Sequence, residues 1–232
     1  MANVLIVGGG AAGLMAAGAA VRQGHKVTVL EHMDKPGQKI LVTGKGRCNV
    51  TNDCTAEEFL RHVRTNPRFL FSSLGAFPPA KTMELFEGLG VELKVERGRR
   101  VFPVSDKAEE IRLACCATPR GPRSSTTAQK CFCWSRWPRQ KTRSRPGDPR
   151  HTKRKSPARR PLCGRAGTSG KEYRADAVLV ATGGLSYPTT GSTGDGYRLA
   201  QQAGHAIVEP VPSLVSLVSH DPDCKKSDGS GA

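Results

Sequence analysis

Two apolar runs and the small-residue stretch between them organise the first 31 positions of the chain. Asn3–Val7 (NVLIV) and Lys26–Leu30 (KVTVL) are short and rich in β-branched residues, which is typical of parallel strands buried in a sheet. From Gly13 onward, small side chains fall on one helical face, and Gly24 can end that helix. The pattern predicts a strand, a helix and a second strand, which together form a βαβ unit.

The turn between the first strand and the helix carries a GxGxxG motif. Gly8 permits a tight turn, Gly10 lets the main chain approach a pyrophosphate, and Gly13 permits close packing of the helix on the sheet. Free N–H groups at the helix N-terminus favour phosphate binding. Glu31, at the end of the second strand, can accept hydrogen bonds from an adenosine ribose. The unit predicts a dinucleotide site; the alternative is a glycine-rich turn without a ligand.

A long Gly-rich segment, Asp34–Asn52, follows the βαβ unit and is expected to be a loop. It contains four cations: Lys35, Lys39, Lys45 and Arg47. Such a segment is either a solvated surface loop or part of a ligand site, and the carboxyl ends of parallel strands are where ligands bind. Its glycines, cations and amide groups suit anionic oxygens, so ligand contact is the favoured interpretation.

Further elements are predicted up to residue 112. A TAEE capping box beginning at Thr55 starts a helix, and a second helix spans Pro79–Leu89. Val91–Val95 and Arg100–Phe102 form a short hairpin. Ser105 is a candidate N-cap for the next helix.

Regular patterning returns after residue 167. Ala177–Ala181 is predicted to be another buried strand, and residues 194–196 lead into a short helix that ends at Gly204. Ala206–Glu209 is a candidate last strand, and the tail after Val218 is polar.

The segment between these two parts has a different composition. The chain of 232 residues has a net charge of +16, and residues 113–170 hold 15 of its 36 Lys and Arg but only one of its 20 Asp and Glu. Seven of the 16 prolines lie within residues 113–167. We expect this stretch to form no helix of ordinary length and to be disordered. The strong basic charge therefore describes one segment and not the whole fold.

The N-terminal segment and the cysteines indicate in which cellular compartment the protein is expected. A secretory signal is disfavoured because the first basic residue is Arg22 and glycines interrupt the apolar run. Outside the basic stretch there are three cysteines, Cys48, Cys54 and Cys224, and no CxxC motif, which predicts reduced thiols and a cytoplasmic protein. No metal site, membrane span or membrane contact is expected, because His and Cys residues lack ligand spacing and no long apolar run occurs.

Three motifs together resemble a known family: VLIVGGGAAGLMAA…VLE, GQKILVTGKGRCNVTN and ADAVLVATGGLSYPTTGSTGDGYRLAQQAGH. They are similar to the bacterial FAD-dependent oxidoreductases of the aminoacetone-oxidase or bile-acid-reductase-like (BaiN-like) flavoprotein family, over about residues 1–112 and 168–218. The resemblance implies an α/β fold, with a Rossmann-like FAD-binding domain into which a separate substrate domain is inserted. It also implies FAD as cofactor, with NAD(P)H as a candidate electron donor, and hydride chemistry that belongs to the flavin.

The resemblance also assigns residues to the flavin site. The first motif implies pyrophosphate contact by its three glycines and ribose contact by its acid. The second motif is implied to approach the pyrophosphate, ribityl or isoalloxazine side, and the turns of the third motif are implied to pass near the cofactor. The implied cofactor-binding residues are Gly8, Gly10, Gly13, Glu31, Gly44, Arg47, Cys48, Asn49, Thr182, Gly183, Gly184, Gly194, Asp195 and Gly196. Asp195 either caps its helix or touches the ligand. Cys48 either has a redox role or, as we favour, packs as a small buried thiol. No catalytic acid or base is identified.

The chain departs from the family pattern in two ways. Family members continue well beyond its length, so we expect a truncated version with an incomplete FAD domain and little of the substrate domain. The basic segment stands where the family has a helix and strands, which suggests a compensated frameshift. The expected organisation is a first FAD-binding part at 1–112, an aberrant basic segment at 113–167, a second FAD-binding part at 168–218 and a disordered tail at 219–232.

Three functions compete at this point. The leading one is an FAD-dependent oxidoreductase whose activity in this chain is in doubt. The second is a dinucleotide-binding remnant without turnover. The third, and least favoured, is nucleic-acid binding by the run KTRSRPGDPRHTKRK with Trp134 and Trp137 nearby. The small-molecule substrate and the oligomeric state are left open.

Overall fold

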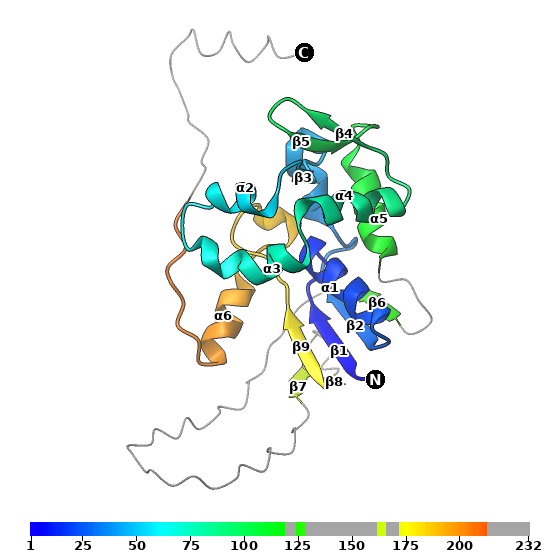
Figure 1. The fold of residues 1–232 in the computed structure, drawn as a ribbon. Helices are drawn as coiled ribbons and strands as arrows, with labels where there is room; N and C mark the ends of the chain where they lie inside the picture. Colours follow the sequence, from blue (N-terminus) through cyan, green and yellow to red (C-terminus); the bar gives the residue numbers. More distant parts are fainter. Residues whose placement is uncertain (119–123, 129–161, 166–171, 213–232) are drawn as a thin grey trace, which may run out of the picture.

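A four-stranded parallel sheet forms the centre of the protein (Figure 1). The computed structural model describes residues 1–118, 124–128, 162–165 and 172–212. The strand order is β6-β2-β1-β9, with β1 at Asn3–Val7, β2 at Lys26–Glu31, β6 at Ser124–Ala128 and β9 at Ala177–Val180. The predicted α/β class and the strands of the βαβ unit are therefore confirmed.

Side chains of β1 alternate between two covered faces. Ile6 points into a cluster with Val27, Val29 and Ala17, so helix α1 (Ala11–Arg22) covers this face. Leu5 packs with Leu30 and Ala175 on the opposite face, where β8 (Glu172–Ala175) lies. Strand β8 pairs in an antiparallel manner with β7 (Leu162–Arg165). Burial on both faces explains the continuous apolar run of β1.

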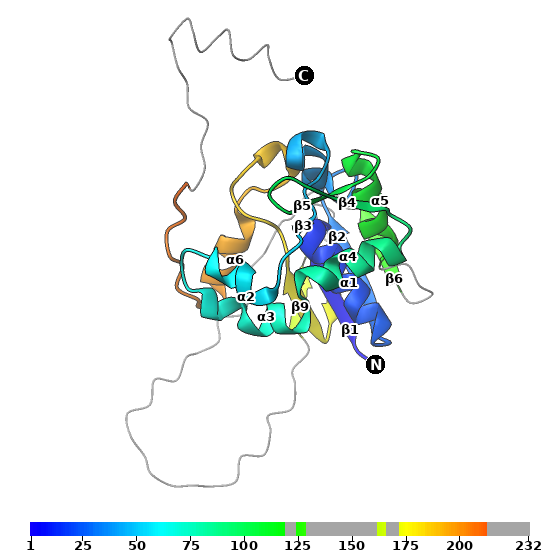
Figure 2. The same ribbon diagram turned by 45° about the horizontal axis from the view of Figure 1, so that its top comes forward.

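A second layer packs beyond the sheet. The 3-10 helix η1 (Gln38–Gly46) lies against α5 (Ala108–Ala117), and the two share a core cluster with Leu14 of α1. The antiparallel sheet β3-β5-β4 lies beyond the carboxyl ends of β1 and β2, as the turned view shows (Figure 2). Its strands are β3 (Thr51–Asn52), β4 (Leu93–Glu96) and β5 (Arg100–Pro103). The remaining elements are α2 (Ala56–Arg61), η2 (Pro67–Leu70), α3 (Phe71–Ala76), α4 (Pro79–Gly88), η3 (Pro188–Thr190) and α6 (Asp195–Gln202).

Two local predictions in this layer are confirmed. Thr55 and Glu58 form the full capping box of α2, with the Thr55 hydroxyl 3.1 Å from the Glu58 backbone nitrogen. The hairpin β4–β5 forms as the apolar pattern predicted. Both features are set by residues close in sequence, which is why the pattern could find them.

Five other expectations differ from the structure. The strand predicted at Ala177–Ala181 forms as β9 but is not buried, because β9 lies at the edge of the sheet with Leu179 and Val180 exposed. The segment Asp34–Asn52 is not simply a loop, because Ile40 is buried and anchors η1 to the core. Ser105 is not an N-cap: α5 begins at Ala108, after Asp106 has taken a left-handed conformation to reach Lys94. Ala206–Glu209 forms no strand and is largely exposed. Helix α5 continues past the expected boundary at residue 112 to Ala117, because its residues pack against η1 and α1.

Part of the basic segment takes regular structure. Strand β6 extends the central sheet by pairing with β2, and β7 pairs with β8. The prediction of a low-order segment at 113–167 otherwise falls largely outside the described residues, as does the predicted tail at 219–232.

Candidate functional site

The site lies where the carboxyl ends of three parallel strands meet. Val7 is in register with Leu30 of β2 and Val180 of β9. The Gly8 amide donates to the Leu30 carbonyl oxygen at 2.8 Å, and the Ala181 amide donates to the Val7 carbonyl oxygen at 2.7 Å. The turns that follow β1, β2 and β9 are therefore brought to one edge of the sheet, which is the usual ligand position in such folds.

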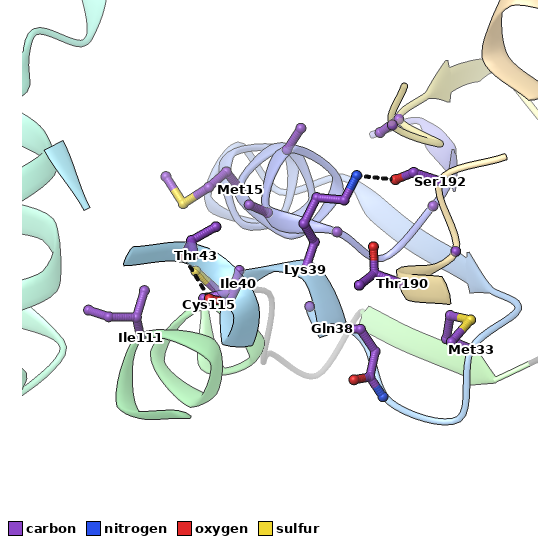
Figure 3. A pocket seen from close by; sticks show the side chains of 18 of the residues that line it. Met15, Met33, Gln38, Lys39, Ile40, Thr43, Ile111, Cys115, Thr190 and Ser192 are labelled. Carbon is purple, nitrogen blue, oxygen red and sulfur yellow. Dashed lines mark hydrogen bonds between the residues drawn. The ribbon is translucent and has the colours of Figure 1, made fainter. Parts of the chain in front are cut away.

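A cavity of about 660 Å³ opens at this edge (Figure 3). Its lining comes from the β1–α1 turn, the end of β2, η1, α4, α5 and the segment between β9 and α6. The volume falls within the range of about 300–1,000 Å³ found for small-molecule and cofactor sites.

Eight of the fourteen residues that the resemblance assigned to the cofactor line this cavity. They come from both parts of the chain: Gly8, Gly10, Glu31, Cys48, Asn49, Thr182, Gly183 and Asp195. The other six do not line it: Gly13, Gly44, Arg47, Gly184, Gly194 and Gly196. The structure therefore brings together segments almost 190 residues apart in sequence, and contact of these residues with the cofactor stays a prediction.

The glycines of the first motif have three different roles. Gly8 has a positive φ of 106°, and a Cβ there would overlap the carbonyl oxygen of Ala181. A Cβ at Gly13 would overlap the carbonyl oxygen of Gly8, so this glycine allows α1 to begin close to the turn. A Cβ at Gly10 would meet no atom within 4 Å. Gly10 thus faces open space in the cavity, whereas Gly8 and Gly13 are required by packing.

Glu31 is a buried acid at the end of β2. Its side chain accepts hydrogen bonds from the backbone N–H of Gly9 at 2.7 Å and of Met33 at 2.8 Å. His32 lies alongside, with its Nδ1 3.6 Å from the carboxylate. A carboxylate offers about four acceptor positions. Glu31 is therefore fixed in orientation and keeps acceptor capacity for hydroxyl groups of a ligand.

Arg47 is engaged away from the cavity. Its guanidinium lies 2.9 Å from the Glu96 carboxylate and 3.2 Å from that of Asp106, and it stacks 4.1 Å from the centre of the Phe102 ring. The hydrogen bond from Arg47 lowers the pKa of Glu96. In this structure Arg47 links the end of η1 to Glu96 of β4 and to Asp106, which follows β5. The family resemblance had implied a place for Arg47 at the cofactor, and the loop composition had predicted contact with an anionic ligand.

Two other glycines outside the cavity, Gly44 and Gly196, support close packing. A Cβ at Gly44 would lie 2.7 Å from the Asn49 nitrogen, where the chain turns back on itself. A Cβ at Gly196 would lie 2.7 Å from the Thr182 hydroxyl oxygen, so this glycine lets α6 approach the β9 turn. These positions shape the site without lining it.

Two cysteines lie in both the cavity lining and the core cluster. Cys48 and Cys115 are almost fully buried. Burial raises the pKa of the Cys48 thiol, and it raises that of Cys115 to about 12. A neutral buried thiol is a poor nucleophile. The geometry supports the packing interpretation of Cys48, and a redox role stays a prediction.

Asp195 is the first residue of α6, and Gly194 occupies the N-cap position. The Asp195 carboxylate pairs with Arg198 and accepts a hydrogen bond from the Thr193 hydroxyl at 2.9 Å. The hydrogen bond from Arg198 lowers the pKa of Asp195, so the group is ionised at neutral pH. Because Gly194 and not Asp195 is the N-cap residue, the Asp195 side chain does not cap α6, and ligand contact by Asp195 stays a prediction.

Sequence reasoning missed several lining residues. Lys39 donates to the Ser186 carbonyl oxygen and to the Ser192 hydroxyl, both at 2.6 Å, and so bridges η1 and the segment before α6. An apolar wall comes from α1, α4 and α5, formed by Met15, Phe86 and Ile111. Lys39 was visible only as one of four loop cations, and the wall had no sequence signal because its members are brought together by tertiary packing.

The lining fits a dinucleotide. Gly10, Ala11 and Ala12 begin α1 and line the cavity, and the first N–H groups of a helix have no partner within it. The open space at Gly10 leaves room for a group that contacts the backbone, and Glu31 stands at the next strand for a ribose. The buried Thr182 hydroxyl also lacks a hydrogen-bond partner within the described chain.

Two further searches covered only the described residues. No group of three or more His, Cys, Asp and Glu residues there is arranged to hold a metal ion. No described helix is both long enough and apolar enough to cross a membrane.

Comparison with known proteins adds a family match. Residues 2–133 match the family described as the HI0933-like protein Rossmann domain. The chain is 33% identical over 219 residues to the 3-dehydro-bile acid delta(4,6)-reductase of Clostridium scindens, covering 94% of this chain and 47% of the relative. It is 28% identical to the ribosomal RNA dihydrouridine synthase of Haemophilus influenzae, covering 94% of this chain and 49% of that protein. The chain spans about half the length of these curated relatives.

Among solved structures, an open conformation of a flavocytochrome c3 fumarate reductase matches with a TM-score of 0.48 and 18% identity. The match covers 87% of this chain and 40% of that one.

Proposed function

The chain belongs to the HI0933-like family, and from that premise we propose that it is the FAD-binding part of an FAD-dependent oxidoreductase. Family membership confirms the predicted Rossmann-like fold and FAD as the cofactor. The proposal rests on the cavity at the sheet edge. Gly10, with open space beside it, and Glu31, with its buried carboxylate, both line this cavity.

Each part of the site has a task in binding. The N–H groups at the start of α1 would hold the pyrophosphate, and the Glu31 carboxylate would accept hydrogen bonds from the adenosine ribose. The Gly9 and Met33 amides keep that carboxylate in place. The apolar wall with Phe86 and Ile111 would exclude water from the part of the cavity that it lines once the cofactor is bound. When bound, the flavin supplies hydride transfer, and the protein supplies position and electrostatics.

Similarity to known proteins does not identify the substrate. The names of the two relatives specify a bile acid in one case and ribosomal RNA in the other. The alternative of a dinucleotide-binding protein without turnover makes the same use of Gly10 and Glu31, and it differs only in that neither NADH nor NADPH would reduce the bound flavin.

Flavin reduction tests the proposal. The protein is mixed with FAD under anaerobic conditions, and NADH or NADPH is added while the visible flavin absorbance is followed. We expect bleaching faster than that of free FAD, with one nucleotide preferred. Dithionite reduces any accessible flavin and serves as the control. Bound FAD that responds to dithionite but to neither nucleotide excludes NAD(P)H as donor and favours the alternative without turnover.

We also propose a cytoplasmic location for the protein. Support comes from Cys48, Cys54, Cys115 and Cys116, which carry no disulfide in the described part of the chain. Nucleic-acid binding by the basic segment stays a prediction, because the run with Trp134 and Trp137 lies outside the described residues.

A further inference from the structure

The structure separates the four cations of the segment after β2 into those that line the cavity and those that do not. Lys35 and Lys39 line it, whereas Lys45 and Arg47 do not. The sequence alone treated the four as equivalent candidates for binding an anion.

Three of the four are poor candidates. Arg47 is paired with Glu96 and Asp106, so its charge is already balanced. Lys45 is exposed and lies outside the cavity lining. Lys35 is exposed at the rim, and its charge acts on the Glu109 carboxylate.

Lys39 differs from the other three. Lys39 is a half-buried residue, and its ammonium group is held 2.6 Å from each of two neutral oxygens, the Ser186 carbonyl and the Ser192 hydroxyl. Figure 3 shows its side chain extended along the cavity toward Ser192. Within the described residues no carboxylate pairs with it. An ammonium has three donors, so one is left for a further acceptor.

The surroundings of Lys39 favour an anion. Burial lowers the pKa of Lys39, which means that its charged form is disfavoured by loss of solvent. The first turn of α1, with Gly10, Ala11 and Ala12, lines the same cavity and carries the positive end of the helix dipole. An anion in the cavity would interact favourably with both.

We propose that Lys39 is a cofactor-binding residue whose ammonium pairs with the pyrophosphate of the bound dinucleotide. The inference rests on the proposed function and deepens it. The pyrophosphate is the anionic part of FAD, and the flavin and adenosine parts are uncharged. Lys39 would thus contact the phosphates from η1, in the same cavity that the backbone of the β1–α1 turn lines. An anionic substrate at the same ammonium is the competing ligand, and the choice of probes separates the two.

The test compares three ligands by titration calorimetry on the full chain: FAD, ADP and riboflavin. FAD and ADP contain the pyrophosphate, and riboflavin does not. We expect Lys39→Gln to weaken FAD and ADP about 10- to 100-fold, as for loss of a hydrogen bond to a charged group. Riboflavin affinity should change less than about twofold. Lys39→Arg, which keeps the charge, should restore most of the affinity for FAD and ADP.

Two matched variants separate charge from shape. Lys45→Gln removes an exposed cation of the same segment and should change affinity for ADP by less than about twofold. Ser192→Ala removes a neutral partner of Lys39 but leaves the charge of Lys39 in place. It should therefore lower the affinity for ADP much less than Lys39→Gln does. Equal losses for Ser192→Ala and Lys39→Gln would mean that Lys39 only ties the two segments together, and the inference would be wrong.

Three other results overturn the inference. Unchanged ADP affinity in Lys39→Gln shows that no phosphate contact is lost. An equal loss of riboflavin and FAD places the effect at the flavin or on cavity shape. A wild-type chain that binds none of the three ligands leaves Lys39 without a phosphate to contact. Normal ADP binding without flavin reduction, by contrast, rejects only the proposed oxidoreductase function and leaves the role of Lys39 intact.

Discussion

Gly10→Ala should lose FAD affinity by about 100-fold while folding almost as stably as the wild type. The backbone at Gly10 has φ −74° and ψ −177°, which alanine adopts without strain, and an added Cβ meets no protein atom within 4 Å. The same Cβ would point into the space that the pyrophosphate needs beside the main chain. Steric overlap in a well-packed site costs about 1–3 kcal/mol, or roughly 5- to 150-fold in affinity, and a Cβ against the pyrophosphate belongs at the upper end of this range.

Two measurements on Gly10→Ala check this result. Calorimetric titration gives the FAD affinity, and urea unfolding gives the stability. We expect the stability to fall by only about 1 kcal/mol, which is the typical cost of alanine at an N-cap, because the added Cβ meets no protein atom. An affinity for FAD equal to that of the wild type would show that the cofactor does not approach Gly10.

Gly13→Ala, unlike Gly10→Ala, should act mainly on stability. We expect it to destabilise the folded protein by about 3 kcal/mol or more. Its Cβ would overlap the carbonyl oxygen of Gly8, which belongs to the backbone and cannot rotate away as a side chain can. The start of α1 would have to move off the turn, and the packing of Leu14 and Ala17 would move with it. Urea unfolding followed by circular dichroism measures the change.

Gly88→Ala is the matched control for the stability measurement. It is also a glycine within a helix, α4, and a Cβ there meets nothing within 4 Å. We expect it to stabilise the protein by up to about 1 kcal/mol, because alanine is the better helix former. If Gly13→Ala were as stable as Gly88→Ala, the close contact between α1 and the β1–α1 turn would be contradicted.

The parts of the fold that the sequence predicted well depend on local signals. The run Asn3–Val7, the glycines after it and Glu31 lie within 31 residues, and each has a strong conformational preference. The capping box at Thr55 is equally local. Helix α5 was cut short at residue 112 because the prolines and arginines that follow hide its last turn, which is stabilised by packing against η1.

The site was harder to predict than the fold. Glu31 and Gly10 could be placed because a βαβ unit fixes where they lie. The choice between Arg47 and Lys39 depended on Glu96, Asp106 and Ser192, which are 49 to 153 residues away in sequence. A carboxylate that neutralises a cation from such a distance leaves no mark in the local pattern, so only the structure separates a structural arginine from a lysine that faces the cavity.

An equilibrium titration of the purified 232-residue chain with FAD tests the central claim most directly. Quenching of flavin fluorescence is followed as protein is added, with ADP as competitor. The account predicts saturable binding of one FAD per chain and its displacement by ADP, since both ligands would occupy the site at Gly10 and Glu31. FAD that stays free at every protein concentration, with circular dichroism showing a folded chain, would contradict it.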